Sequence, residues 1–201
     1  MSSRRGFLAA GATVAAVAGV AWPALAAATD FDRAAFLALA RAPFAHRQSF
    51  ASPLVANGAV LGFMFNSLNA YEHGFDDAPG TLHAAAVLYH TGVALALDDA
   101  AWNAYGIADA VRAAGDRVDA VAGSGNPFVR GPRGWSFGEL QGRRASFFAC
   151  SNALGDLARR TDTTPELLRT HILPGMMVVP AGVAAINALQ EERFTLFVAN
   201  A

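Results

Sequence analysis

The chain has a single cysteine, Cys150, in a position where a thiol can do chemistry. Residues 147–150 are typical of a short buried strand, and residues 151–160 predict a helix directly after it. Ligands of open α/β sheets bind outside the carboxyl ends of the strands, and the thiol would face that edge. The start of the helix would also stabilise the thiolate, which is the reactive form of cysteine. The alternative is that Cys150 is a small buried hydrophobic residue, as free cysteines most often are.

The first 26 residues predict an export signal and not a part of the fold. Arg4 and Arg5 precede an uncharged stretch up to residue 20, and a small-x-small cleavage pattern ends at Ala26. The paired arginines resemble a twin-arginine signal, which is a receptor-read address. The alternatives are an ordinary secretory signal and an uncleaved anchor, although the stretch is short for a membrane span. We expect the mature protein to reside in a bacterial periplasm without stable membrane insertion.

The remaining residues, 27–201, are enough for one domain. Structural cysteines come in pairs in an oxidising compartment, so a lone Cys150 must be buried, paired between chains or chemically used. The formal net charge is −1 and there is no lysine, so no electrostatic footprint for nucleic acid is present. Hydrophobic residues make up 54% of the chain, which indicates well-buried strands and an interface between copies in a homo-oligomer.

Strand and helix patterns alternate along the mature chain. Short apolar runs predict strands at residues 46–51, 82–89, 147–150, 176–179 and 194–198. Helical spacing predicts helices at residues 55–74, 93–105, 151–160, from 164 onward and 183–192. This alternation predicts an α/β fold, with a five-stranded, mostly parallel sheet and helices on both faces.

An insertion at about residues 106–134 interrupts the alternation and is rich in glycine and arginine. Its first part, residues 107–114, predicts a short helix, and the remainder predicts a long loop. Long loops in compact domains are usually functional lids or disordered segments. Two interpretations follow. The loop is either a flap over the cysteine, with Arg130 or Arg133 meeting an anion, or a solvated insertion.

The order of motifs resembles the DsrE/DsrF-like family, whose fold is named for YchN. The resemblance rests on residues 147–154 and 173–183, preceded in the same order by residues 46–48, 66–70 and 90–92. It covers residues 45–198 and implies a five-stranded, flavodoxin-like domain that assembles into dimers, trimers or hexamers. In the sulfur-relay members, a cysteine in this loop carries a persulfide. By position, the resemblance gives that role to Cys150.

Five further residues are candidates for the same site. The backbone amides of Ser151 and Asn152 would stabilise negative sulfur at the start of the helix. His90 ends a neighbouring strand and would act there as a proton donor or acceptor, or would merely cap the strand. Asn66 and Asn69 share one face of a helix, where they would line the pocket or tie down a nearby loop.

We therefore predict a cysteine-based sulfur carrier of periplasmic sulfur metabolism, closer to a sulfurtransferase than to a turnover enzyme. Its partners would be sulfur donor and acceptor proteins or small sulfur species, and it would need no cofactor. The first alternative is a periplasmic binding or assembly module of the same fold without cysteine chemistry. A weaker alternative is a metal- or haem-binding protein that uses His73, His83 or His90, although the histidines lack close metal spacing.

Overall fold

The computed structural model describes residues 31–75, 77–119, 124–130 and 135–199. The predicted signal peptide, residues 1–26, lies outside these ranges, as does Arg133 of the predicted insertion. Within the described ranges, no helix is both long enough and apolar enough to cross a membrane.

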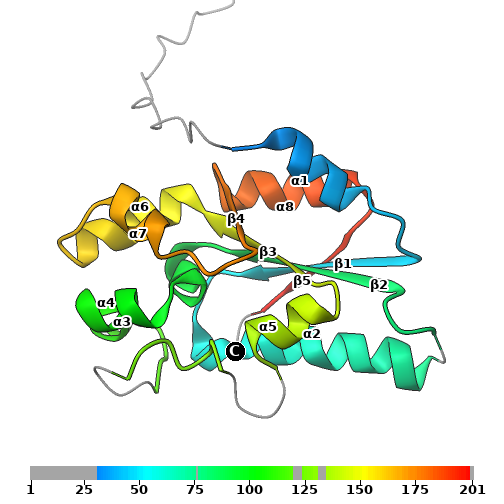
Figure 1. Cartoon of the computed structure of the whole chain (residues 1–201), viewed down its shortest axis with the longest axis horizontal. Helices are drawn as coiled ribbons and strands as arrows, with labels where there is room; N and C mark the ends of the chain where they lie inside the picture. The colour runs from blue at the N-terminus through cyan, green and yellow to red at the C-terminus, as the bar shows by residue number, and fades with distance from the viewer. Residues whose placement is uncertain (1–30, 76, 120–123, 131–134, 200–201) are drawn as a thin grey trace, which may run out of the picture.

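Five parallel strands form one sheet in the order β4-β3-β2-β1-β5 (Figure 1). The strands are β1 (His46–Ser52), β2 (Leu82–Leu88), β3 (Ser146–Cys150), β4 (Met177–Val179) and β5 (Thr195–Val198). The predicted five-stranded α/β fold is thereby confirmed. The strand order differs from the flavodoxin order 2-1-3-4-5. Here the chain builds the sheet outward from β1 to β4 and then adds β5 on the other side of β1.

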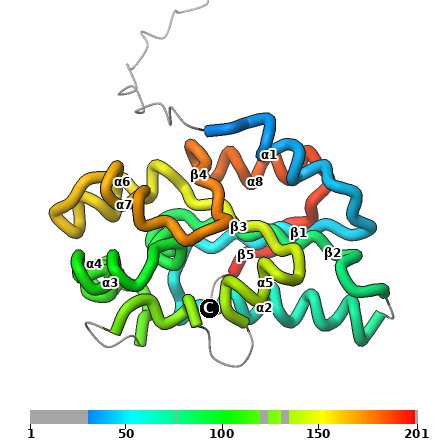
Figure 2. Tube along the Cα trace, viewed as in Figure 1, coloured from blue at the N-terminus to red at the C-terminus, as the bar shows by residue number. Residues whose placement is uncertain are grey.

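Helices cover both faces of the sheet, as the trace in Figure 2 shows. Helices α1 (Arg33–Ala40) and α8 (Gly182–Glu191) pack on one face, and α2 (Ala59–Asn69) packs on the other. Because side chains alternate along a strand, Phe148 of β3 joins the α1/α8 side and Phe147 joins the opposite side. The remaining helices are η1 (Ala56–Gly58), η2 (Ala70–Gly74), η3 (His90–Ala96), α3 (Asp99–Ala104), α4 (Ile107–Ala113), α5 (Phe137–Gly142), α6 (Ser151–Arg160) and α7 (Pro165–Thr170).

The helix predicted at residues 93–105 is wrong in its first half. Residues 90–96 form the 3-10 helix η3, and the backbone is extended at Leu97, which bridges to Ile172. Helix α3 begins only at Asp99, because the side chain of Asp98 accepts a hydrogen bond from the N–H of Ala101 at 2.8 Å. An aspartate that caps a helix within an apolar pattern therefore marks the start of a new helix.

Two helices, α1 and α5, were not expected from the sequence. Helix α5 has a complete capping box: the Ser136 hydroxyl accepts the N–H of Glu139, and the Glu139 carboxylate accepts the N–H of Ser136. Helix α1 begins after Asp32, whose carboxylate accepts the N–H of Ala35 at 2.8 Å. Both caps are visible in the sequence, so the capping residues alone could have predicted these two helices.

The described part of the insertion is anchored to the core by buried side chains. The amide nitrogen of Asn126 donates to the carbonyl oxygens of Leu95 and Leu97 at 3.1 and 2.6 Å. The ring of Phe128 packs so close to Gly58 that a Cβ built there would lie 2.5 Å from a ring carbon. The side chain of Arg130 is almost fully exposed. These contacts tie the segment to η1 and η3.

Candidate functional site

Cys150 ends strand β3, and its sulfur accepts two backbone hydrogen bonds. The N–H of Ala153, in the first turn of α6, lies 3.4 Å from Sγ, and the N–H of Gly182, the first residue of α8, lies 3.1 Å from it. The amino termini of two ten-residue helices therefore converge on one sulfur atom. Only 5% of Cys150 is exposed, so the residue is largely shielded from solvent.

The local sequence explains how both helices reach the sulfur. Cys150 has extended backbone angles and serves as the N-cap of α6, with its own side chain as the acceptor. Helix α8 approaches because Gly182 has no side chain. A Cβ at that position would lie 2.7 Å from the Cβ of Tyr89 and 3.4 Å from the Cβ of Cys150. A larger residue would force the start of α8 away from the thiol.

Backbone donors and a guanidinium gather around the start of α6 and the sulfur. Helix amino termini carry partial positive charge, and N–H groups directed at an anion stabilise it. The guanidinium of Arg169, on α7, donates to the hydroxyl of Ser151 at the start of α6, which adds a full positive charge nearby. Burial acts in the opposite direction, because it removes water from a charged sulfur. The arrangement can hold an anionic sulfur species that is shielded from solvent.

The other residues predicted at this edge differ in their exposure and in their distance along the chain from Cys150. Ser151 is buried and Asn152 is exposed, and both belong to the first turn of α6. His90 is exposed two residues after the end of β2, with a left-handed φ of 50°. The register pairs Leu88 with Ala149, so Tyr89 is the residue placed next to the thiol. His90 thus lies on the same rim, one position further along the chain.

Asn66 and Asn69 are not brought to Cys150. The side-chain oxygen of Asn69 accepts a hydrogen bond from the guanidinium of Arg143 at 2.8 Å. Arg143 precedes β3, so this contact lies at the amino-terminal edge of the sheet. Asn66 is exposed on α2. The physical reason is the length of α2: eleven residues at 1.5 Å rise carry its carboxyl end about 16 Å along the sheet.

The sequence did not point to three residues of this site: Tyr89 and Gly182 beside the thiol, and Arg169, which contacts Ser151. Burial raises the pKa of Tyr89, so its phenol stays protonated well above neutral pH. Gly182 carried a local signal, since it follows Pro180 and Ala181 at the end of a predicted strand. Nothing local distinguishes Arg169 from the other arginines. Its contact with Ser151 depends on the packing of α7 against α6.

The three histidines considered for a metal or haem site lie in different elements. His73 is exposed in η2, His83 is buried in β2 and His90 is exposed in η3. Among the residues that the structure describes, no group of three or more His, Cys, Asp or Glu side chains could hold a metal ion.

Comparisons with known proteins give a likeness to solved structures alone. No protein-family profile and no curated protein matches the chain. A solved structure of a protein of unknown function from Methanobacterium thermoautotrophicum, MTH1491, is similar at 21% sequence identity with a TM-score of 0.44. The match covers 76% of this chain and 98% of that one.

Proposed function

We propose that this protein is an exported, DsrE-like sulfur carrier in which Cys150 holds sulfur as a persulfide in the periplasm. The observation that supports the proposal is the pair of backbone N–H groups, from Ala153 and Gly182, directed at Sγ. A persulfide is an anion at neutral pH and needs such donors when it is shielded from water. Val183, strongly exposed beside Gly182, offers an apolar contact for a partner that approaches this edge.

The transfer step requires no oxidant beyond the donor itself. The thiolate of Cys150 attacks the outer sulfur of a donor persulfide or polysulfide. A new S–S bond forms at Sγ, the S–S bond of the donor breaks, and the donor leaves with the electron pair as a thiolate. An acceptor thiolate then removes the outer sulfur by the same exchange. In this proposal His90, on the same rim, exchanges protons with the arriving and leaving thiols.

Mass spectrometry after incubation with inorganic polysulfide tests this function. The protein should gain the mass of one sulfur atom, and a thiol reductant should remove it. Cys150→Ser should gain nothing, and Gly182→Ala should load poorly because its methyl group displaces the N–H donor of α8. Asn187→Ala is the matched control on α8: its side chain is exposed and donates to Glu191 away from the sulfur, so loading should equal that of the wild type. Absence of any sulfur gain in the wild type, with polysulfide or with thiosulfate, contradicts the proposal.

The alternative is a periplasmic binding or assembly module without cysteine chemistry. The burial of Cys150 favours this alternative, since a packed thiol is normally inert. The same experiment separates the two functions, because a module of this kind would not load sulfur.

We also propose that the protein forms homo-oligomers through the edge of the sheet at β5. This strand has three substantially exposed apolar residues, Leu196, Phe197 and Val198. The ring of Phe197 packs on the ring of Phe63 of α2, with 5.0 Å between the ring centroids. An exposed apolar edge strand is a template for pairing with another chain. Light scattering should show a dimer or a larger species for the wild type and a monomer for Leu196→Glu. Val183→Glu, on α8, should keep the wild-type mass. A monomeric wild type at micromolar concentration would refute the idea.

A further inference from the structure

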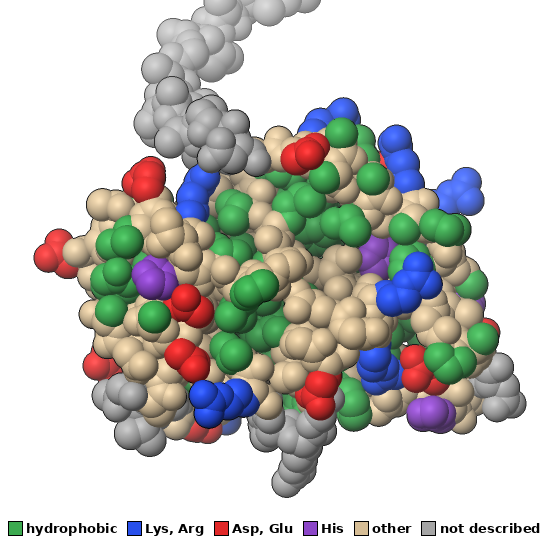
Figure 3. All heavy atoms as spheres, in the orientation of Figure 1, with side chains coloured by type: hydrophobic (Ala, Val, Ile, Leu, Met, Phe, Trp, Pro, Cys, Tyr) green, Lys and Arg blue, Asp and Glu red, His purple; other side chains and the backbone are tan. Residues whose placement is uncertain are grey.

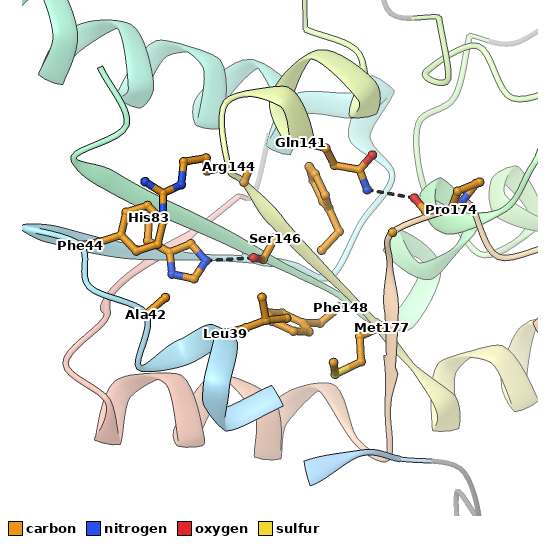
Figure 4. Close-up of a pocket in the computed structure, with 13 residues that line it drawn as sticks. Leu39, Ala42, Phe44, His83, Gln141, Arg144, Ser146, Phe148, Pro174 and Met177 are labelled. Atoms are coloured by element: carbon orange, nitrogen blue, oxygen red, sulfur yellow. Dashed lines mark hydrogen bonds between the residues drawn. The ribbon is translucent and has the colours of Figure 1, made fainter. Parts of the chain in front are cut away.

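A cavity of about 590 Å³ lies at the amino-terminal edge of the sheet, at the opposite end of β3 from Cys150. This volume is typical of small-molecule sites. Its walls come from the end of α1 and the segment after it, the end of α5, the loop before β4 and the first residues of β2, β3 and β4 (Figure 4). On this face of the molecule hydrophobic side chains gather around α1, with arginine and histidine side chains beside them (Figure 3).

Most of the lining is apolar. Leu39, Phe148 and Met177 lie together below Ser146, and Phe44 closes the other end (Figure 4). Leu39 is substantially exposed although it is large and hydrophobic. An apolar wall of this kind matches a ligand with a hydrocarbon or aromatic body.

Two polar side chains of the cavity, His83 and Ser146, form a hydrogen-bonded pair. Nε2 of His83 lies 2.9 Å from Oγ of Ser146, and Nδ1 of His83 is buried without a partner among the described residues. Arg47 and Arg144 lie close enough to act on the charge of His83. Beside two cations, an unpartnered lone pair on Nδ1 costs less than an unpartnered N–H there. The proton therefore belongs on Nε2, Ser146 accepts it, and the Ser146 hydroxyl hydrogen is free for a ligand.

Arg144 supplies an uncompensated positive charge at the mouth of the cavity. Its guanidinium lies 4.3 Å from the ring centroid of Phe44, whose ring is also stacked on His83 at 4.5 Å. Among the described residues no carboxylate forms an ion pair with Arg144. The neighbouring Arg143, by contrast, pairs with Glu72 at 2.7 Å. Phe44 thus holds the Arg144 guanidinium in place without neutralising it.

We propose that this cavity binds a small carboxylate with an apolar body. The carboxylate meets the guanidinium of Arg144 and the hydroxyl of Ser146, and the apolar body lies against Leu39, Phe148 and Met177. The site binds and does not catalyse. Among the described residues no carboxylate orients Nδ1 of His83. Burial, together with the charges of Arg47 and Arg144, opposes protonation of the ring, so His83 does not activate Ser146 as a nucleophile.

Calorimetric titration of the full chain with phenylacetate and 4-methylpentanoate tests the proposal. Both should bind, and the uncharged phenylacetamide should bind at least about tenfold more weakly, since a charge-assisted contact is lost. Arg144→Gln should weaken phenylacetate by about tenfold for the same reason. Met177→Trp should abolish binding by filling the cavity. Arg159→Gln removes an exposed arginine on α6 and should bind as the wild type does.

Three results would overturn the proposal: no binding of either carboxylate to the wild type, equal binding of the amide, or wild-type affinity in Arg144→Gln. Thermal melting of each variant verifies folding, and Met177→Trp gives an independent test that leaves Arg144 in place. The two sites lie at opposite ends of β3, so Cys150→Ser should bind phenylacetate with unchanged affinity. Failure of carboxylate binding and failure of sulfur loading are therefore separate results.

Discussion

Replacing Asp116 with alanine should lower the free energy of unfolding by about 4 kcal/mol, since it leaves several buried donors without an acceptor. The Asp116 carboxylate is buried and accepts from the backbone N–H groups of Val55, Ala56 and Arg117 at 2.6, 3.1 and 2.6 Å. It also accepts the hydroxyl of Thr91 at 2.6 Å. One side chain of the insertion thus fixes the loops that follow β1 and β2. Urea unfolding of the two proteins measures the difference.

Two matched variants separate this role from a general effect of removing an aspartate. Asp116→Asn keeps the shape and one acceptor oxygen, so it should lose clearly less stability than Asp116→Ala. Asp109→Ala removes an exposed carboxylate that forms an ion pair with Arg112 in the same helix, and it should cost less than about 1 kcal/mol. If Asp116→Ala is as stable as Asp109→Ala, the four hydrogen bonds do not hold the loops together.

The centre of the sheet was predictable because its strands β2 and β3 are buried on both faces. Residues 82–88 read as a nearly continuous apolar run, and every residue of β2 is buried. Helix limits were less predictable where a cap and an apolar pattern compete, as at Asp98. The role of Asp116 could not be predicted, since it depends on a loop that meets two strand ends 25 and 61 residues away in sequence.

The candidate site at Cys150 was predictable in position and not in composition. A thiol between a strand and a helix places itself at the carboxyl edge of the sheet, as observed. The second helix amino terminus comes from Gly182, 32 residues further along, and requires the packing of α8 against β3. The sequence predicted Asn66 and Asn69 at the wrong edge of the sheet. Their spacing shows that they share a helix face, but it does not show which edge of the sheet that part of the helix reaches.

The cavity at the opposite edge had one visible signal, a histidine inside an apolar strand. His83 is 1% exposed, stacks on Phe44 and meets the ring of Phe194 edge-on at 5.1 Å. Its surroundings come from β1, β3 and the loop before β1, which no local pattern connects. Burial, together with the charges of Arg47 and Arg144, lowers the pKa of His83 to about 4.

This lowered pKa predicts that the free energy of unfolding decreases as the pH is lowered from about 6.5 to about 4. In that window the unfolded chain binds a proton at His83 and the folded chain does not, so acid favours unfolding. The contribution is complete above pH 6.5 and is lost progressively as the pH approaches 4. A shift of this size corresponds to about 3 kcal/mol.

Urea unfolding from pH 7.5 to 4.5 measures this contribution when the wild type is compared with His83→Gln. The glutamine variant should be less stable at pH 7.5, because it loses the ring stacking, but its stability should fall less steeply with acid. Carboxylates that titrate in the same range act equally on both proteins and cancel in the difference. His73→Gln changes an exposed histidine in η2 and should keep the wild-type slope. An unchanged slope in His83→Gln would mean that acid destabilises the fold through other groups and that His83 is not held neutral by its burial beside two arginines.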